Sequence, residues 1–305
     1  MKRLLLVVAL VASSLPVLAV NGPKPSKNKV STKAGTLFFH WGYNRSWYTQ
    51  SALTFQGQGY DFTMSEAKAH DHPAKFGKTY FNPKTITVPQ FNVRVGYNIS
   101  DNWAISIGYD HMKYIFADNN AVVLNGFIEP GLDDVSNLSG NYTDFEMATE
   151  REKFHYENSD GLNFIRAEVT RMQDIYFTKD RNFGIAGLAS VSAGGVLSFN
   201  DFRFAGVNTM RTISLSGYGI AAHVGLRFEF FKHVYLQANY GGGFIHQVNV
   251  KNRPTNIDAT ARTMTINVEA YYTADAETSS NKLNVVLLQD SIIGPQQGAS
   301  AYPAQ

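Results

Sequence analysis

The sequence predicts an all-β protein, an eight-stranded antiparallel transmembrane up-and-down β-barrel with long extracellular loops. Two observations lead to this fold class. Eight stretches of the chain alternate apolar side chains with polar or small ones, which is the pattern of strands whose two faces meet different surroundings. These stretches come after an amino-terminal export signal, which directs the chain out of the cytoplasm.

The first 19 residues have the composition of a signal peptide. Met1, Lys2 and Arg3 supply a positive start, residues 4–12 are apolar, and residues 17–19 end in a small-residue cleavage pattern. The apolar stretch is too short for a transmembrane anchor, and polar residues and a proline come after it. We therefore expect cleavage after residue 19, which leaves a basic, polar leader at the start of the mature chain.

The clearest pair of strands surrounds a short turn at residues 99–102. In residues 91–98 and again in 103–110, every second side chain is apolar or aromatic. The turn between them has the composition of a hairpin connection, so the two stretches predict a β-hairpin. A soluble sandwich would alternate in the same way. Tyr97 and Trp103, however, lie on the apolar face beside the turn, where membrane barrels place an aromatic girdle.

The remaining expected strands show the same alternation, and their lengths suit the roughly 25 Å apolar band of an outer membrane. The connections alternate long and short, and in such barrels the short turns are periplasmic, so both termini are expected in the periplasm. The apolar pieces 53–55 and 60–64 would break this alternation if they crossed the membrane, so we read them as structure inside the first loop. The expected strands are 37–48, 86–99, 102–116, 162–177, 183–199, 213–231, 234–250 and 264–272.

One of these strands alternates imperfectly. In residues 162–177, Arg171 and Gln173 share a face with Ile165, which predicts a bulge near Thr170 or a register shift near the periplasmic edge. The carboxyl end also departs from the usual pattern, because barrels of this class normally finish on an aromatic residue of the last strand. The expected regions are a signal peptide (1–19), a periplasmic leader (20–35), an outer-membrane β-barrel (36–274, with long loops 49–85 and 117–161) and a polar carboxyl-terminal tail (275–305).

The composition supports this interpretation. The chain has 21 Phe, 16 Tyr and 25 Gly, the residues that strands, girdles and tight bends use. No segment after the signal reaches the roughly 18 apolar residues that a membrane helix needs, which argues against a helical bundle. The chain has no cysteine, as fits an exported protein that depends on strand closure and not on disulfides. The net charge of +2 gives no indication of nucleic-acid binding.

The inward face of the expected barrel is polar. An eight-stranded barrel is just wide enough for side chains to fill it, and charges buried there need partners. We therefore expect a lumen filled by ion pairs and hydrogen bonds, with no catalytic, cofactor-binding or metal-binding residues, and we keep a narrow pore as the alternative. The expected polar network of the lumen is His40, Arg94, Asp110, Arg166, Glu168, His223, Arg227, Glu229 and Glu269.

The second long loop is strongly acidic. Residues 117–160 hold ten acidic residues against Arg151 and Lys153. Their spacing matches no calcium-binding loop, so we expect a solvated acidic loop. Arg45 leaves the membrane at the end of the first strand, where it could hold a lipopolysaccharide phosphate or form a salt bridge.

Two groups of residues could carry chemistry at the extracellular rim, namely His70, Asp71 and His72 in the first loop and Asp110 with His111 in a strand. An outer-membrane hydrolase or acyltransferase would place one of these imidazoles within hydrogen-bond reach of a carboxylate. Neighbouring residues of a strand point to opposite sides, so Asp110 and His111 cannot both face the lumen. No nucleophile motif or phosphate-binding loop is present, and we do not expect an enzyme.

Four segments carry a resemblance to known proteins: 38–47 (FFHWGYNRSW), 59–63 (GYDFT), 80–83 (YFNP) and 110–114 (DHMKY). On these segments the chain resembles small outer-membrane β-barrel proteins of the OmpA/OmpX-like architectural group, and more narrowly barrel proteins of gliding-type and gut Gram-negative bacteria. The resemblance extends over the barrel portion, from Gly35 to Val250. It implies a surface-exposed membrane protein, and it transfers no activity and no functional residues.

These observations together lead us to expect an outer-membrane protein without enzymatic activity. It would contribute to envelope integrity or make surface contacts through its loops. The expected partners are outer-membrane lipid and lipopolysaccharide, together with the barrel insertion machinery during assembly, and neither a cofactor nor nucleic acid is expected. A soluble ligand-binding barrel is a further alternative, and it would carry its apolar residues on the inside.

Overall fold

The computed structural model describes residues 32–75, 77–82, 84–85, 89–135, 137–248 and 250, and the backbone of 265–280. The expected signal peptide, most of the leader and the tail beyond residue 280 lie outside the described residues. Within the described part the regular structure is β-strand, apart from the short 3-10 turn η1 (Lys78–Tyr80). None of the helical structure described there is long and apolar enough to cross a membrane.

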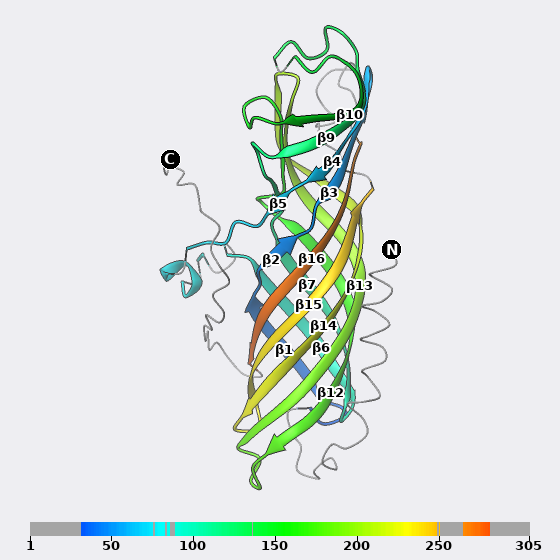
Figure 1. Ribbon diagram of the computed structural model, residues 1–305. Coiled ribbons are helices and arrows are strands. Elements are labelled where there is room, and N and C mark those ends of the chain that lie inside the picture. Colours follow the sequence, from blue (N-terminus) through cyan, green and yellow to red (C-terminus); the bar gives the residue numbers. More distant parts are fainter. Residues whose placement is uncertain are drawn as a thin grey trace.

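Long strands, each paired antiparallel with the next, form the tilted wall in the lower part of Figure 1. The last of them pairs in turn with the first, where His40 lies opposite Ser279. The all-β antiparallel fold class is therefore confirmed. In order around the wall the strands are β1 (Leu37–Tyr43), β6 (Phe91–Ser100), β7 (Trp103–Met112), β12 (Leu162–Phe177), β13 (Phe183–Phe204), β14 (Val207–Phe230), β15 (Val234–Gln247) and β16 (Thr265–Ser280).

The two long segments expected to be loops form a second set of strands, which build the upper end of the molecule (Figure 1). β3 pairs with β16 and β4, and β9 pairs with β4 and β10, so these strands continue the sheet of the wall. We call this set, with the upper ends of β13 and β14, the cap. Its strands are β2 (Ser46–Tyr48), β3 (Ser51–Gly57), β4 (Tyr60–Ala67), β5 (Ala69–His70), β8 (Ile115–Phe116), β9 (Ala121–Ile128), β10 (Gly140–Ala148) and β11 (His155–Glu157).

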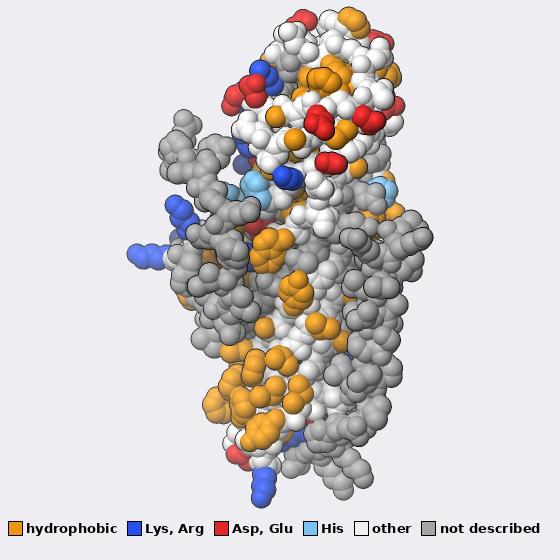
Figure 2. Space-filling model, in the orientation of Figure 1, with side chains coloured by type: hydrophobic (Ala, Val, Ile, Leu, Met, Phe, Trp, Pro, Cys, Tyr) orange, Lys and Arg blue, Asp and Glu red, His pale blue; other side chains and the backbone are white. Residues whose placement is uncertain are grey.

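The apolar side chains of the lower wall face outward. Leu37 is 72% exposed, Ile107 is 70% exposed and Val95 is 55% exposed, whereas their strand neighbours Arg94 and Ser106 point inward and are buried. Figure 2 shows hydrophobic side chains gathered over the lower part of the molecule. The predicted orientation of these strands is confirmed, and their described inward side chains are mainly polar, apart from a small apolar cluster of Phe38, Ala104, Met172 and Leu188.

The pattern reverses in the cap. On the upper part of β13, Phe202 and Phe204 are buried, whereas Asp201 and Arg203 are part-exposed on the other face. Phe154 lies at the centre of the apolar interior. Its ring centroid is 5.1 Å from that of Phe55, 5.8 Å from that of Phe202 and 6.2 Å from that of Phe204. The cap therefore has an aromatic core and a polar surface, as a protein domain in water does.

Several strand ends differ from the sequence-based expectation. β13 and β14 meet at a two-residue turn, Ala205 and Gly206, because both strands continue upward to bury the aromatic residues of the cap. β16 continues to Ser280, where it pairs with Val234, so the last strand includes the start of the expected tail. In β12 the second of the two expected alternatives is found: the register shifts between Asp174 and Tyr176, close to the turn, and there is no shift at Thr170.

Replacing the central ring of the cap tests this division. Phe154→Ala should destabilise the cap by about 3–5 kcal/mol, because the ring is buried and leaves a cavity among other rings. Hydrogen exchange should accelerate in β3, β4 and β9 while the wall strands β6 and β7 keep their protection. Phe145→Ala is the matched control, since Phe145 is 47% exposed. Equal effects of the two substitutions would contradict a cap core centred on Phe154.

Candidate functional site

The densest group of buried charges lies inside the lower wall. Arg94 on β6 places Nη1 2.6 Å from Oδ1 of Asp110, and Arg166 on β12 places Nε 2.8 Å from its Oδ2. Glu168 completes the group, with its Oε2 at 3.2 Å from Nη1 of Arg166. The side chains of all four residues are at most 9% exposed. Two arginines and two carboxylates therefore neutralise one another away from solvent.

Gly108 makes this arrangement possible. It lies on β7, directly opposite Arg94 on one side and Arg166 on the other. A Cβ atom at this position would be 2.5 Å from Cδ of Arg94, which is closer than side chains pack. The missing side chain leaves room for the guanidinium group of Arg94 to reach Asp110.

A second polar group lies beside it. Nε and Nη2 of Arg227 donate to Oε1 of Gln237 at 2.9 and 2.7 Å, and the guanidinium stacks 3.9 Å from the ring centroid of Tyr235. Gln237 in turn donates to Asn239 at 3.3 Å. His223 places Nδ1 3.4 Å from Nη1 of Arg166.

Most of the expected network residues lie inside the wall. The side chains of eight of them are buried, and the four that form the ion-paired group come from three adjacent strands, β6, β7 and β12. The side chain of Glu269 lies outside the described part of the chain. The eight buried residues are His40, Arg94, Asp110, Arg166, Glu168, His223, Arg227 and Glu229.

Removing the central carboxylate tests the ion-paired group. Asp110→Asn leaves Arg94 and Arg166 without their shared counter-charge, and breaking a buried pair in this way costs about 3–5 kcal/mol. Urea unfolding of the folded protein in lipid vesicles measures this loss. Asp134→Asn, at an exposed position of the cap, is the control and should change the stability by less than about 0.5 kcal/mol. A loss for Asp110→Asn as small as that of the control would show that the ion pairs are not needed.

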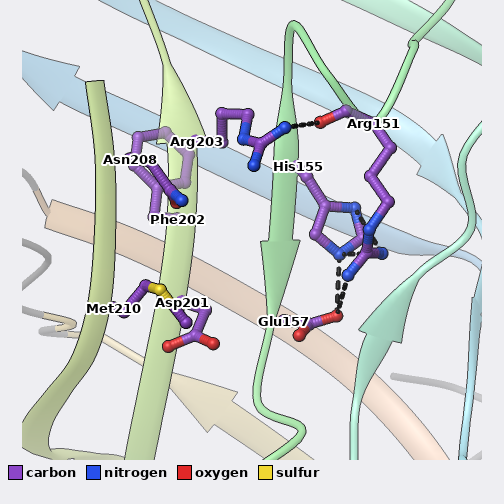
Figure 3. A pocket seen from close by; sticks show the side chains of 8 residues that line it. All are labelled: Arg151, His155, Glu157, Asp201, Phe202, Arg203, Asn208 and Met210. Atoms are coloured by element: carbon purple, nitrogen blue, oxygen red, sulfur yellow. Dashed lines mark hydrogen bonds and ion pairs between the residues drawn. The ribbon is translucent and has the colours of Figure 1, made fainter. Parts of the chain in front are cut away.

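A second charged group, which the sequence analysis did not anticipate, lies on the outer side of the cap (Figure 3). His155 on β11 places Nδ1 2.8 Å from Asp118 and Nε2 2.9 Å from Glu157. Arg151 also reaches Glu157, at 2.9 Å, and Asp118, at 3.5 Å. The sequence indication of this group was that His155 and Glu157 are two positions apart and so share one face of a strand. Their partner Asp118 could not be found in this way, because it is 37 positions from His155.

These contacts shift the pKa values of the group. Burial alone would lower the pKa of His155, and the charge of Arg151 acts in the same direction. The hydrogen bonds to Asp118 and Glu157 outweigh both, so the pKa of His155 is raised above its ordinary value of 6.5. Burial favours a higher pKa for Glu157, but hydrogen bonds from His155, Arg151 and Ser159 outweigh it and lower this pKa to about 2.

Half of the acidic residues in 117–160 are held in ion pairs, which corrects the expectation of a simply solvated acidic loop. Their partners are basic residues of the same segment and of the β13 and β14 hairpin, and Arg211 pairs with Asp160 at 2.6 Å. The paired acidic residues are Asp118, Glu150, Glu152, Glu157 and Asp160. The pairs of Glu152 with Arg203 and of Asp160 with Arg211 join the second long segment to the β13 and β14 hairpin.

A small cavity of about 110 Å³ lies beside this group, between β11 and the β13 and β14 hairpin (Figure 3). Arg151, His155 and Glu157 line one side, and Asp201, Arg203 and Met210 lie around the other. Arg203 is already paired with Glu152, and Asp201 accepts a hydrogen bond from the main chain of Arg211. The charges around the cavity are thus largely satisfied by one another.

The residues singled out for rim chemistry do not form imidazole–carboxylate pairs. His70 places Nδ1 2.9 Å from the main-chain oxygen of Asp71, whose carboxylate instead accepts from the main chain of Ser46 at 3.0 Å. His111 points outward and places Nδ1 2.8 Å from Oδ1 of Asn163, whereas Asp110 points inward. Burial raises the pKa of Asp71, against the effects of Ser46 and Arg45. Among the residues that the structure describes, no group of His, Asp and Glu side chains could hold a metal ion.

No known protein family matches the sequence, and no curated protein is similar to it. Among solved structures, the chain is similar to the outer membrane protein OprG from Pseudomonas aeruginosa, with 10% identity and a TM-score of 0.37 over 83% of this chain and 99% of that one. It is also similar to the outer membrane protein AlkL in lipid bilayers, with 11% identity and a TM-score of 0.33 over 88% of this chain and 100% of that one. A third similar structure is Ail, the attachment invasion locus protein of Yersinia pestis, with 13% identity and a TM-score of 0.24 over 75% of this chain and 97% of that one. Likenesses at these scores carry no functional assignment.

The pKa shifts of the cap predict a pH dependence. The raised pKa of His155 means that its stabilising effect is fully present below pH 6.5 and is lost as the pH rises through the higher folded value. The lowered pKa of Glu157 has the opposite sign, so its effect is present above pH 4.5 and is lost as the pH falls towards about 2. The cap should therefore resist protease best between these limits, and cleavage should accelerate on the alkaline side.

His155→Gln should remove the alkaline part of this dependence, because glutamine cannot take up the proton. His72→Gln is the control, since His72 is exposed in the first long segment. Cleavage rates measured across the pH range should then separate the two variants. A wild-type rate that does not change on the alkaline side would show that His155 does not hold the cap.

Proposed function

We propose that this chain is an outer-membrane protein whose eight wall strands close into a transmembrane β-barrel. The observation that carries the proposal is the opposite orientation of apolar side chains in the two halves of the molecule. The lower wall exposes residues such as Leu37, Val95 and Ile107, and the cap buries its aromatic residues. A monomeric protein in water rarely exposes so large an apolar surface, whereas a barrel in lipid requires one.

The lumen of this barrel is filled and does not conduct. The ion-paired group of Arg94, Asp110, Arg166 and Glu168 occupies the lower interior. The aromatic core around Phe154 occupies the interior of the cap above it. Charged side chains that neutralise one another fill a narrow barrel and offer no unpaired charge to a passing ion. The apolar core above them excludes water.

The protein acts without catalysis, by contributing to envelope integrity and by presenting the cap for surface contacts. The support is the placement of the candidate imidazoles, which bond to a main-chain oxygen and to an asparagine and not to a carboxylate. The cap is a folded β-structure held together by ion pairs between its segments, which suits a surface that partners recognise. The proposed partners are outer-membrane lipid and lipopolysaccharide, and the barrel insertion machinery assembles the wall.

A charged substitution on the outer face tests the membrane assignment. Ile107→Arg, in the middle of β7, should cost about 2–4 kcal/mol when the protein is folded in lipid vesicles, because the guanidinium must enter the apolar band. Val135→Arg is the matched control: Val135 is 52% exposed in the cap segment between β9 and β10, where arginine remains in water. Its cost should stay within about 0.5 kcal/mol. The folded fraction is read from the change in gel mobility on boiling, and similar costs for the two variants would contradict a wall in lipid.

A further inference from the structure

One segment outside the barrel wall serves neither the lumen nor the cap. Residues 71–90, which we call the arm, leave the wall after β5 and return to it before β6. The described residues of the arm are 71–75, 77–82, 84–85 and 89–90. In Figure 1 the cyan part of the chain projects to the left of the wall at the junction of wall and cap. The arm therefore extends sideways and does not cover the top of the molecule.

Both ends of the arm are fixed at one place on the wall. The carboxylate of Asp71 accepts a hydrogen bond from the main chain of Ser46 at 3.0 Å. The main-chain oxygen of Gln90 accepts one from Asn44 at 3.3 Å. These two acceptors hold the arm at the upper end of β1, where the strand leaves the apolar part of the wall.

The middle of the arm packs on the outer face of that strand. Tyr43 donates its hydroxyl to the main-chain oxygen of Tyr80 at 2.7 Å, and the two rings pack edge to face with their centroids 4.6 Å apart. Trp41 lies behind Tyr43, also at 4.6 Å between centroids. Tyr43 shares its face with Phe39, which is 49% exposed. The arm thus rests on the aromatic residues that form the upper border of the outward apolar surface.

Three lysines and one phenylalanine are among the exposed side chains of the described arm residues. Lys75, Lys78 and Lys84 are exposed, and within the described part of the chain none of them forms an ion pair. The sole acidic residue of the arm is Asp71, at its root. Phe81, between the lysines, is 48% exposed. Figure 2 shows several acidic side chains over the cap above the arm, and some basic side chains lie among them.

We propose that the arm binds the anionic head groups of the lipid that surrounds the upper border of the wall. This inference rests on the proposed function, which puts that border at the membrane surface. Lysine side chains attract phosphate-bearing lipids, and aromatic side chains favour the boundary between head groups and acyl chains. The three lysines supply the charge, and Phe81 supplies the apolar contact. Tyr80, through its contacts with Tyr43, holds these side chains at the level of the upper border of the wall. The occupant is thus the lipid surface itself, and no protein partner is required.

The absence of cysteine from the chain gives a direct test. The substitution Thr79→Cys places one fluorescent label on η1. It keeps the hydrogen bond from the Thr85 hydroxyl, because that bond is accepted by the main-chain oxygen of residue 79. The labelled full chain is folded into vesicles of phosphatidylcholine alone or in equal mixture with phosphatidylglycerol. Neutral acrylamide in the water measures how far the label is shielded. We expect shielding in the anionic vesicles that added salt weakens, and each lysine changed to glutamine should weaken this partition about fivefold.

Three variants make the outcome decisive. Replacing Lys75, Lys78 and Lys84 by glutamine should abolish the shielding, and replacing all three by arginine should retain it. Replacing Lys153, Lys179 and Lys232 by glutamine removes the same charge elsewhere and should leave the shielding unchanged. Equal shielding in both kinds of vesicle, or shielding that depends on protein density and not on lipid charge, would overturn the proposal. If the gel mobility still changes on boiling in those samples, only the arm proposal fails; if it does not, the barrel proposal fails as well.

Discussion

Asp110, shared between Arg94 and Arg166, shows the constraint on which the lower half of the molecule depends. Most outward side chains of the lower wall are apolar, and the four charged side chains of the ion-paired group face inward. Charges confined in this way cannot reach water, and each must find a counter-charge within a narrow interior. Gly108 results from the same constraint, because a side chain at this position would clash with the guanidinium group of Arg94. An apolar outer face therefore requires that the charges on the inner face of the wall balance one another.

The same strands meet a second environment higher up. β13 keeps its even-numbered residues inward along its whole length, yet these residues change from Ser190 and Ser192 in the wall to Phe202 and Phe204 in the cap. The backbone continues without interruption, and only the type of residue is exchanged between the faces. In its upper part the sheet has an apolar core and a charged surface, as suits contact with water. The ion pairs of His155 and Arg151 lie on that outer side, where salt and pH reach them.

The sequence predicted the features that a period of two determines and missed those that depend on distant pairing. The bounds of β12 and the inward position of Arg94 and Arg166 could be read from alternation alone. That Arg94 pairs with Asp110 on the next strand depends on register, which one sequence does not reveal. The apolar pieces of β3 and β4 were recognised as structure inside the first loop. Their pairing was missed, because β3 pairs with β16, which lies near the other end of the chain. The group around His155 was missed for the same reason, since Asp118 belongs to another turn.

A buried polar group shows how the cap is held in one register on the wall. The hydroxyl of Tyr156 lies 3.3 Å from side-chain oxygens of Asn158, Asn200 and Gln247, and all four residues are fully buried among apolar side chains. Polar groups in such a place are costly unless they meet one another, and a shift of one residue in β11 would separate them. Phenylalanine rings alone could slide and still remain buried. The aromatic core therefore supplies stability to the cap, whereas the bonds of Tyr156 to residues of β13 and β15 specify its position.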